Sequence, residues 1–369
     1  MKWKSFLNWI GWNSSDKKII SESEYAFLCD AWENEKKRIL TGPDIFFTEE
    51  TSLIKEIRRE TAVKNRNNIT RTKAYLSFYE RNPEVHWPFL AHMVSRNGGY
   101  HMTDLKGPFM QEILPYAERK KFFHFLETGN AAIFSGIYPQ LLIYEYARHS
   151  ERLMQKLLRA FKVSLFMHPI WEMCRKEKKP ELLTVAMIMN EQHMLDEKII
   201  KQRPGKDIVR RLDFQLQEML GFTNIVFPFS FSNETLPSLT GLPVKRFSDV
   251  NTRIRLGKQL YQILYDPSIH TDILDFARRT PHTGSRSDYW PAIYSSELTD
   301  SKIHSPCLEK VWSDQPEPVF SAHDWFSCMK DGTELRTLPS IQWKDISLKV
   351  LENTHNLQLI SQIKHLISS

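Results

Sequence analysis

The densest group of reactive side chains in this chain of 369 residues lies in the segment NPEVHWPFLAHMVSRNGGYHMTDLKG, residues 82–107. His86, His92, His101 and Asp104 all fall within it. An imidazole titrates near neutral pH and can give or take a proton, and a neighbouring carboxylate can fix its tautomer. We therefore predict that His101 is a catalytic acid or base and that Asp104 orients it. The alternative is that Asp104 caps a short turn and that the histidines only pack against the core.

The same segment predicts a helix with a clear start and a glycine-rich end. Asn82 is a good N-cap residue, Pro83 suits the first helical position, and Asn97-Gly98-Gly99 is typical of a helix stop. With 3.6 residues per turn, His86 and Asn97 return to nearly the same face of this helix. We therefore add both residues to the site as candidate ligand-binding side chains.

A second candidate unit is HTGSRSDYWP, residues 282–291. Its glycine and serines can present backbone N–H groups, and an arginine fork binds carboxylate or phosphate in two places. The candidate ligand-binding residues here are Ser285, Arg286, Asp288 and Tyr289. The alternative is a surface loop in which Arg286 pairs with Asp288 or with another acid.

The sequence predicts no metal site and names no cofactor. The four cysteines are scattered, with no C-x-x-C pair, which is typical of free thiols in a reducing cytoplasm. Carboxylates and histidines lie close together in three further places, but none has the Glu-x-x-His spacing of di-metal bundles. These places are Glu145 with His149, His168 with Glu172, and Glu191 with His193. The phosphate-binding, dinucleotide-binding, nucleophile-elbow and zinc-protease motifs are absent.

The elements that must position these residues are mostly helices, because apolar residues recur at helical spacing over the first 221 residues. We predict helices over 21–40, 48–79, 82–97, 109–126, 131–147, from Ser150, from Pro180, and over 207–220. Prolines recur after Gly221, and Pro228 makes residues 225–231 an edge strand or an extended loop. The predicted fold is mainly α, with a bundle-like helical body and a loop-rich C-terminal region.

Domain boundaries follow from the same pattern. We expect an N-terminal amphipathic segment at 1–20, a helical body at 21–221, and a proline-punctuated region at 222–369 that packs on the body and ends in a helix. Residues 3–12 combine lysines and tryptophans in a way that permits contact with a membrane surface. No transmembrane segment is predicted, because the best candidate, residues 131–147, contains Pro139 and Glu145 and falls short of the ~20 apolar residues that a bilayer requires.

Charge is unevenly distributed along the chain. Residues 148–179 carry nine basic and three acidic side chains, whereas residues 266–334 carry six basic and twelve acidic ones. Either these regions contact each other, or the basic helices form a surface for nucleic acid or an acidic protein. We predict an interaction or accessory protein that uses this basic surface. The alternative is an enzyme or small-anion binder whose site joins the His86–Asp104 unit to the Gly284–Trp290 loop.

Three stretches resemble the YppC-like proteins of Bacillus-type bacteria. They are NPEVHWPFLAHMVSRNGGYHMTDL at 82–105, ETGNAAIFSGIYPQLLIYEYAR at 127–148 and GSRSDYWP at 284–291. The resemblance implies a cytosolic bacterial protein of unknown function. It supplies no catalytic residues, so it leaves the choice between the two functional readings open.

Overall fold

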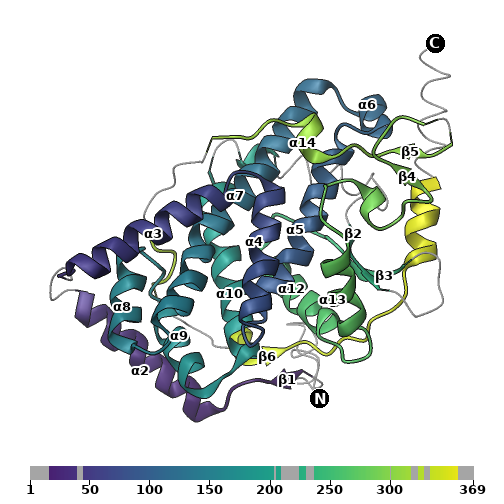
Figure 1. Cartoon of the computed structure of the whole chain (residues 1–369). Helices are drawn as coiled ribbons and strands as arrows, with labels where there is room; N and C mark the ends of the chain where they lie inside the picture. Colours follow the sequence, from purple (N-terminus) through teal and green to yellow (C-terminus); the bar gives the residue numbers. More distant parts are fainter. Residues whose placement is uncertain are drawn as a thin grey trace.

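The helices of a computed structural model are arranged around one long central helix (Figure 1). The structure describes residues 16–39, 45–202, 205–208, 224–229, 237–299, 301–316, 323–327 and 333–355. The predicted membrane-contact segment at 3–12 and residues 209–220 of the predicted helix at 207–220 lie outside this part of the chain. Within it the fold is mainly α, as the hydrophobic pattern predicted.

The N-terminal two thirds of the described chain is a series of helices joined by short turns. They are α2 (Glu22–Ile39), α3 (Thr48–Lys64), α4 (Asn68–Arg81), α5 (Trp87–Asp104), α6 (Pro108–Ile113), α7 (Tyr116–Ala147), α8 (Glu151–Ala160), α9 (Met167–Glu177), α10 (Pro180–Leu195) and the π-helix η1 (Asp196–Ile200). Several starts follow the predicted chemistry. The hydroxyl of Ser150 accepts a hydrogen bond from the Leu153 N–H, and Pro180 opens α10.

The predicted boundaries of the histidine-bearing helix are wrong at both ends. Asn82 is the C-cap of α4, and α5 begins at Trp87 with Pro88 in its first turn. The helix then runs through the expected stop at 97–99 and ends at Asp104. A helical glycine costs only about 1 kcal/mol relative to alanine, and burial along almost the whole helix outweighs that cost.

The predicted break at Thr128-Gly129-Asn130 is also wrong, because α7 is one continuous helix that includes Pro139. Its glycines serve close packing against α10. A Cβ on Gly136 would lie 2.4 Å from the Met194 Sδ, and one on Gly129 would lie 3.4 Å from Leu195 Cδ1. The prediction of a helix over 109–126 fails for another reason, since α6 ends at Ile113 and Pro115 separates it from α7.

The C-terminal region adds two longer helices and short paired strands to this body. The helical elements are α12 (Val250–Leu264), α13 (His270–Arg279), the 3-10 turn η2 (Arg286–Asp288), α14 (Leu308–Val311) and α15 (Thr333–Arg336). Residues 347–355 are also helical, whereas the end of the predicted C-terminal helix lies outside the described residues. Helix α12 packs against both α10 and α5.

The strands of the described chain form separate two-stranded sheets. The strands are β1 (Lys17–Lys18), β2 (Asn224–Phe229), β3 (Ser238–Pro243), β4 (Tyr294–Ser295), β5 (Ile303–His304) and β6 (Thr337–Leu338). β2 pairs antiparallel with β3, so it is an edge strand as Pro228 predicted. β1 pairs antiparallel with β6, which joins the start of the described chain to residues 337–338. No helix within the described ranges has the length and apolar character needed to cross a bilayer.

Candidate functional site

Arg286 and Asp104, both predicted as site residues, form a buried ion pair. The guanidinium donates from Nε to both carboxylate oxygens, at 2.9 and 3.1 Å, and from a terminal nitrogen to Oδ2 at 2.6 Å. Both side chains are less than a tenth exposed. Burial alone would lower the pKa of Arg286, but the charge and hydrogen bonds of Asp104, together with Tyr289 and Tyr294, outweigh it and raise that pKa well above its ordinary value. The anion that Arg286 binds is therefore a side chain of its own chain.

Asp288 forms a second buried cluster beside this pair. Its carboxylate accepts hydrogen bonds from the backbone N–H of Thr283 at 2.9 Å and from the Thr283 hydroxyl at 2.6 Å. It also lies 3.3 Å from His282 Nδ1 and 3.6 Å from Arg96 of α5. Although burial opposes ionisation, the hydrogen bond from His282 and the charge of Arg96 lower the pKa of Asp288. We call Arg96, Asp104, His282, Arg286 and Asp288 the polar network.

Gly99 of α5 allows His282 of the polar network to approach the backbone of this helix closely. A Cβ at this position would lie 2.4 Å from His282 Nε2 and 2.5 Å from Asn68 Oδ1, which are hydrogen-bonded to each other at 2.9 Å. The Gly-Gly pair that predicted a helix end therefore provides room for the 282–290 segment. Ser285 and Tyr289 complete the packing, since Ser285 bonds to the Ser305 carbonyl and the Tyr289 hydroxyl accepts from Arg286 at 2.5 Å.

The expected pairing of Asp104 with His101 is not formed, because the Asp104 carboxylate lies on Arg286 instead. Helix α5 continues to Asp104, so the two residues lie one turn apart, where side chains can interact, but the Arg286 guanidinium binds the carboxylate in place of the imidazole. His101 is neutral: burial and the charge of Arg286 lower its pKa to about 3. Its side chain lines a cavity on another side of α5. The catalytic role of His101 and Asp104 remains a prediction.

His86 and Asn97 also separate. His86 lies just before α5, where its Nδ1 is 2.8 Å from the Tyr261 hydroxyl and its ring stacks on Tyr265 at 4.1 Å. Asn97 binds the free edge of β2: its Oδ1 accepts from the Val226 N–H at 2.8 Å and its Nδ2 donates to the Val226 carbonyl at 2.9 Å. Asn97 thus takes the place of a neighbouring strand, and it also forms part of the cavity wall.

The cavity lies between α5, α7, α10 and α12, with Tyr75 of α4 and Ile225 of β2 at its edges. We call it the helical cavity. Its volume is about 220 Å³. This is larger than the ~150 Å³ that accepts a benzene ring and smaller than the ~300 Å³ of a drug-sized pocket. It therefore has room for a small organic molecule.

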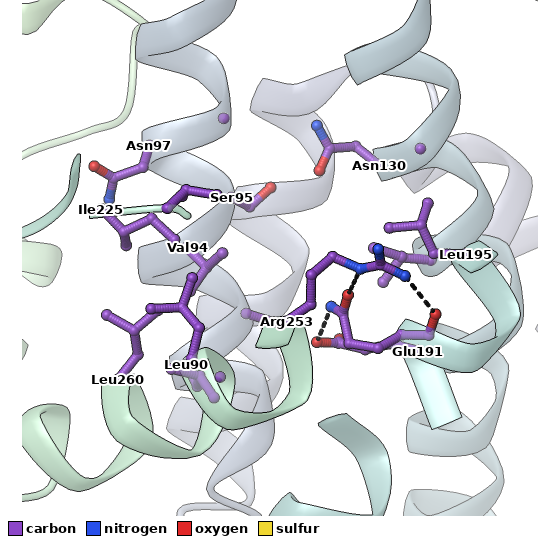
Figure 2. Close-up of a pocket in the computed structure, with 18 of the residues that line it drawn as sticks. Leu90, Val94, Ser95, Asn97, Asn130, Glu191, Leu195, Ile225, Arg253 and Leu260 are labelled. Atoms are coloured by element: carbon purple, nitrogen blue, oxygen red, sulfur yellow. Dashed lines mark hydrogen bonds between the residues drawn. The ribbon is translucent and has the colours of Figure 1, made fainter. Parts of the chain in front are cut away.

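Most of the wall is apolar. Figure 2 shows Leu90, Val94 and Leu260 on one side of the space and Leu195 on the other. The remaining apolar wall residues are Trp87, Ala91, Phe125, Leu126, Ile133, Ile225, Val244, Phe247 and Leu256. Such a surface favours apolar ligands because contact with it removes them from water.

Glu191 of α10 is the one carboxylic acid among the residues that line this cavity. Burial raises its pKa to about 8, and hydrogen bonds from Gln192 and Trp87 only partly oppose that rise. Gln192 Nε2 lies 3.2 Å from Glu191 Oε1. At neutral pH the group is mainly the uncharged acid, which both donates and accepts hydrogen bonds.

Arg253 of α12 reaches into the cavity (Figure 2), but its charge is already neutralised by Asp196, which lies outside the lining. One terminal nitrogen donates to Asp196 Oδ1 at 2.9 Å, and Nε donates to Gln192 Oε1 at 2.9 Å. Both members of the Arg253–Asp196 pair are less than a tenth exposed. Asp196 opens the π-helix that follows α10, and such segments are frequent at functional sites.

Asn130 of α7 supplies a polar group that has no partner among the described residues. Its side chain points toward the cavity, and no hydrogen bond to it is found within the described part of the chain (Figure 2). A Cβ on Gly98 of α5 would lie 3.3 Å from its Nδ2, so the facing glycine leaves space for the amide. The cavity thus combines an apolar wall with a neutral acid and a free amide.

Comparison with known proteins places this chain among its relatives. A family model described as a protein of unknown function, DUF2515, matches residues 63–332. This chain belongs to the DUF2515 family. A relative, the uncharacterized protein YppC of Bacillus subtilis (strain 168), is 39% identical over 280 residues, which cover 74% of this chain and 83% of the relative. The resemblance seen in the sequence is therefore confirmed. No solved structure matches the chain.

Every residue of the helical cavity falls within the segment that matches DUF2515, since the wall extends from Tyr75 to Leu260. The polar network falls within it as well. No cluster of three or more metal-binding side chains is present in the described ranges. The family match therefore covers both regions, and the choice between them depends on their geometry.

The sequence pattern did not identify Glu191 as a ligand-site residue of this DUF2515 chain. From the sequence, Glu191 was considered only as a metal ligand beside His193. The available signal was its setting, because Asn190, Glu191, Gln192 and His193 interrupt a helix that, apart from Thr184, is apolar from Leu182 to Leu195. A helix without a polar face is buried all round, so a carboxylate in it must lie in a core or a cavity.

The basic segment at 148–179 is extensively paired with acids. Arg159 lies 2.9 Å from Glu35 of α2, and Lys156 binds Glu50 of α3. The other pairs are Arg175 with Glu151, Lys176 with Glu151 and Glu172, and Lys179 with Glu24 and Glu177. Several of these acids come from α2 and α3, not from the acidic C-terminal region. Much of the segment's positive charge thus holds helices together.

Proposed function

We propose that this protein binds a small, mostly apolar molecule in the helical cavity. The observation that carries the proposal is a space of about 220 Å³ with an apolar wall, into which a neutral acid and an amide with no partner among the described residues project. Ligand sites are commonly apolar hollows with a few polar groups that orient the ligand, and they occur between the helices of bundles. Two residues predicted for a site, His101 and Asn97, line this same space.

This proposal places the small-ligand site in the helical cavity, whereas the sequence predicted it between the His86–Asp104 unit and the Gly284–Trp290 loop. The polar network joins the two predicted units, but its charged groups bind one another. An anionic ligand at Arg286 would have to replace Asp104, whereas a ligand in the helical cavity breaks no such pair. The cavity therefore supports the ligand-binding alternative with fewer energetic costs.

A surface for nucleic acid or an acidic protein at 148–179 is the second candidate function. The observation in its favour is the excess of basic residues, and the pairing of Lys156, Arg159 and Arg175 with acids weighs against it. A labelled single strand at low salt provides the test, because binding through phosphates is strongest there. Fluorescence anisotropy that stays unchanged up to high protein concentration would reject the nucleic-acid form.

We also propose that the protein is located in the bacterial cytoplasm. Cys29, Cys174 and Cys307 are free thiols in the structure. Free cysteines are typical of a reducing compartment. Immunoblotting of separated cytoplasmic, membrane and secreted fractions tests this location, and it also tests the predicted membrane contact of residues 3–12.

The ligand-binding proposal is tested by filling the cavity. We expect cumene, a compact apolar probe, to raise the melting temperature of the wild-type protein, because a ligand at ten times its Kd adds about 1.4 kcal/mol of stability. Val94→Phe places a ring in the cavity and should abolish this rise. Val63→Phe makes the same change on an exposed face of α3 and should leave the rise intact. An equal rise in both variants, or none in the wild type, would contradict the proposal.

A further inference from the structure

We infer that the ligand of the helical cavity is an uncharged molecule with an acceptor oxygen, and that Glu191 donates a hydrogen bond to this oxygen. The inference rests on the proposed function and specifies the chemistry of its ligand. A ketone, ester or amide oxygen on a compact apolar body meets the requirement. Three features of the cavity support this ligand chemistry: the hydrogen bonds of Glu191, the charges around it, and the amide of Asn130, which has no partner among the described residues.

The first feature is the acid proton of Glu191. Gln192 donates to one carboxyl oxygen, and the Trp87 indole is a second donor to the group. Both partners donate and neither accepts, so the proton of the neutral acid has no acceptor in these contacts. Glu191 is half-buried, and a fully buried donor without a partner costs about 1–3 kcal/mol, so a ligand oxygen that covers this donor would remove up to that cost.

The second feature is the charge of the surroundings, which excludes charged ligands. Among the described residues, no element that packs against Glu191 presents an unpaired charge to it. Tyr75 of α4 and His101 of α5 are neutral, since burial raises the pKa of the phenol well above its ordinary value and lowers that of the imidazole to about 3. Arg253 of α12 is paired with Asp196.

An ammonium ligand would enter an apolar space that already contains the guanidinium of Arg253. An anionic ligand would find that guanidinium occupied. Either ion would lose its water, and that loss costs several kcal/mol unless the protein supplies a matching partner with good geometry. An uncharged ligand avoids the cost.

The third feature is Asn130, whose amide can donate and accept. It lies on α7, whereas Glu191 lies on α10, so the cavity presents hydrogen-bonding groups from two different helices. Arg253 and Asn97 are engaged with Asp196 and with β2, and the Ser95 hydroxyl accepts from Asn68. The buried Nε2 of His101 also lacks a partner in the described residues, so the ligand has polar contacts available at Glu191, Asn130 and His101. Asn130 fits a second polar atom or an ordered water.

The experiment compares four probes of matched size by ligand-observed NMR titration of the full-length protein. They are cumene, acetophenone, 1-phenylethylammonium and benzoate. At about pH 6.5, where Glu191 keeps its proton, we expect acetophenone to bind about tenfold more tightly than cumene, which is the worth of one good hydrogen bond. We expect the two ions to bind more weakly than cumene.

Raising the pH to about 9 should remove most of this preference, because ionised Glu191 no longer donates. Glu191→Gln keeps an N–H donor and should retain the preference at both pH values. Glu191→Leu should lose it at both while still binding cumene. These two variants separate hydrogen bonding from the shape of the cavity.

The outcomes distinguish this inference from the proposed function. Equal binding of acetophenone and cumene at about pH 6.5, or tightest binding of 1-phenylethylammonium, overturns the role of Glu191 but leaves the cavity as a ligand site. Failure of all four probes to bind overturns both. A preference for acetophenone that persists in Glu191→Leu assigns the donor to another residue and also rejects the inference.

Discussion

The polar network and the helical cavity lie on two sides of the same helix, α5, and they use their polar residues in opposite ways. In the network every charge has a partner within the chain, and Asp104, Arg286 and Asp288 satisfy one another or their neighbours. In the cavity Asn130 has no partner in the described ranges, and the acid of Glu191 lacks an acceptor. A cluster of ionisable groups therefore need not be a reactive site, since mutual pairing uses the same interactions that would bind a ligand.

Burial perturbs pKa values in both regions, since it raises that of Asp104 as well as that of Glu191, but the network adds ion pairing that opposes it. In the network the attraction of Asp104 helps to raise the pKa of Arg286 against the effect of burial. In the cavity burial itself raises the pKa of Glu191. Pairing stabilises a charged form and resists change, whereas burial without a partner leaves a group whose state a ligand can alter. The second situation is the better indicator of function here.

The largest expected effect comes from breaking the network. Asp104→Ala leaves the Arg286 guanidinium buried without its carboxylate and should lower the free energy of unfolding by about 3–5 kcal/mol. The double variant Asp104→Leu with Arg286→Met removes both charges and should recover much of the loss. Urea denaturation measures both. A single variant as stable as the wild type would mean that the pair is dispensable, and the comparison of the two regions would lose its basis.

The next effect is a pH dependence that belongs to the cavity. An unfolded glutamate has a pKa of about 4.3, and folded Glu191 has a pKa of about 8. Between these values the folded state binds more protons, so stability falls as pH rises toward 8 and then levels off. The shift sets an upper bound of about 5 kcal/mol, and we expect about 3 kcal/mol because cavity water eases the burial of charge.

Glu191→Gln removes this titration and should flatten the stability profile between about pH 5 and about pH 8. Urea denaturation at several pH values measures it, with Glu352, an exposed residue of the 347–355 helix, as the matched Glu→Gln control. Parallel profiles for wild type and Glu191→Gln would show that Glu191 is not the buried acid that we describe.

A glycine pair on α5 compares the two regions directly. Gly99→Ala places a Cβ against His282 and Asn68 in the network and should destabilise the protein by about 1–3 kcal/mol. Gly98→Ala faces Asn130 in the cavity at 3.3 Å and should change stability by less than about 1 kcal/mol. Thermal unfolding ranks the two. The reverse order would place the tight packing on the cavity side.

The smallest effect separates two asparagines that both line the cavity. Asn97→Ala leaves the Val226 N–H and C=O without their partner and should cost about 1–3 kcal/mol. Asn130→Ala removes an amide that has no bonds in the described structure and should change stability by no more than about 0.5 kcal/mol. Chemical denaturation checks both. A large loss on removing Asn130 would reveal a structural role and would weaken its assignment to the ligand.

Local sequence signals were informative where the local chain controls the outcome. The cap at Ser150, the start of α10 at Pro180 and the edge position of β2 were all predicted. The apolar periodicity also predicted the mainly α fold. These features follow from interactions between residues only a few positions apart, which a sequence displays directly.

Signals that depend on distant partners were misread. Gly98-Gly99 in α5 and Gly129 in α7 predicted helix ends, but both helices continue. A glycine serves equally for a turn and for close packing, and only the residues that pack against it decide between these uses. The contacts at Gly99 come from α4 and from residue 282, far away in the chain.

The sequence by itself determined which side chains this protein carries and that they lie on helices: the histidines of α5, the arginine of the 284–291 motif, and a carboxylate within an apolar helix. The tertiary structure alone decided which of them bind each other and which face a cavity. Arg286 binds Asp104, 182 positions away in the chain, whereas Glu191 forms no ion pair within the described ranges. The reason is physical: pairing and burial are properties of three-dimensional neighbours, and residue types and local spacing do not specify them.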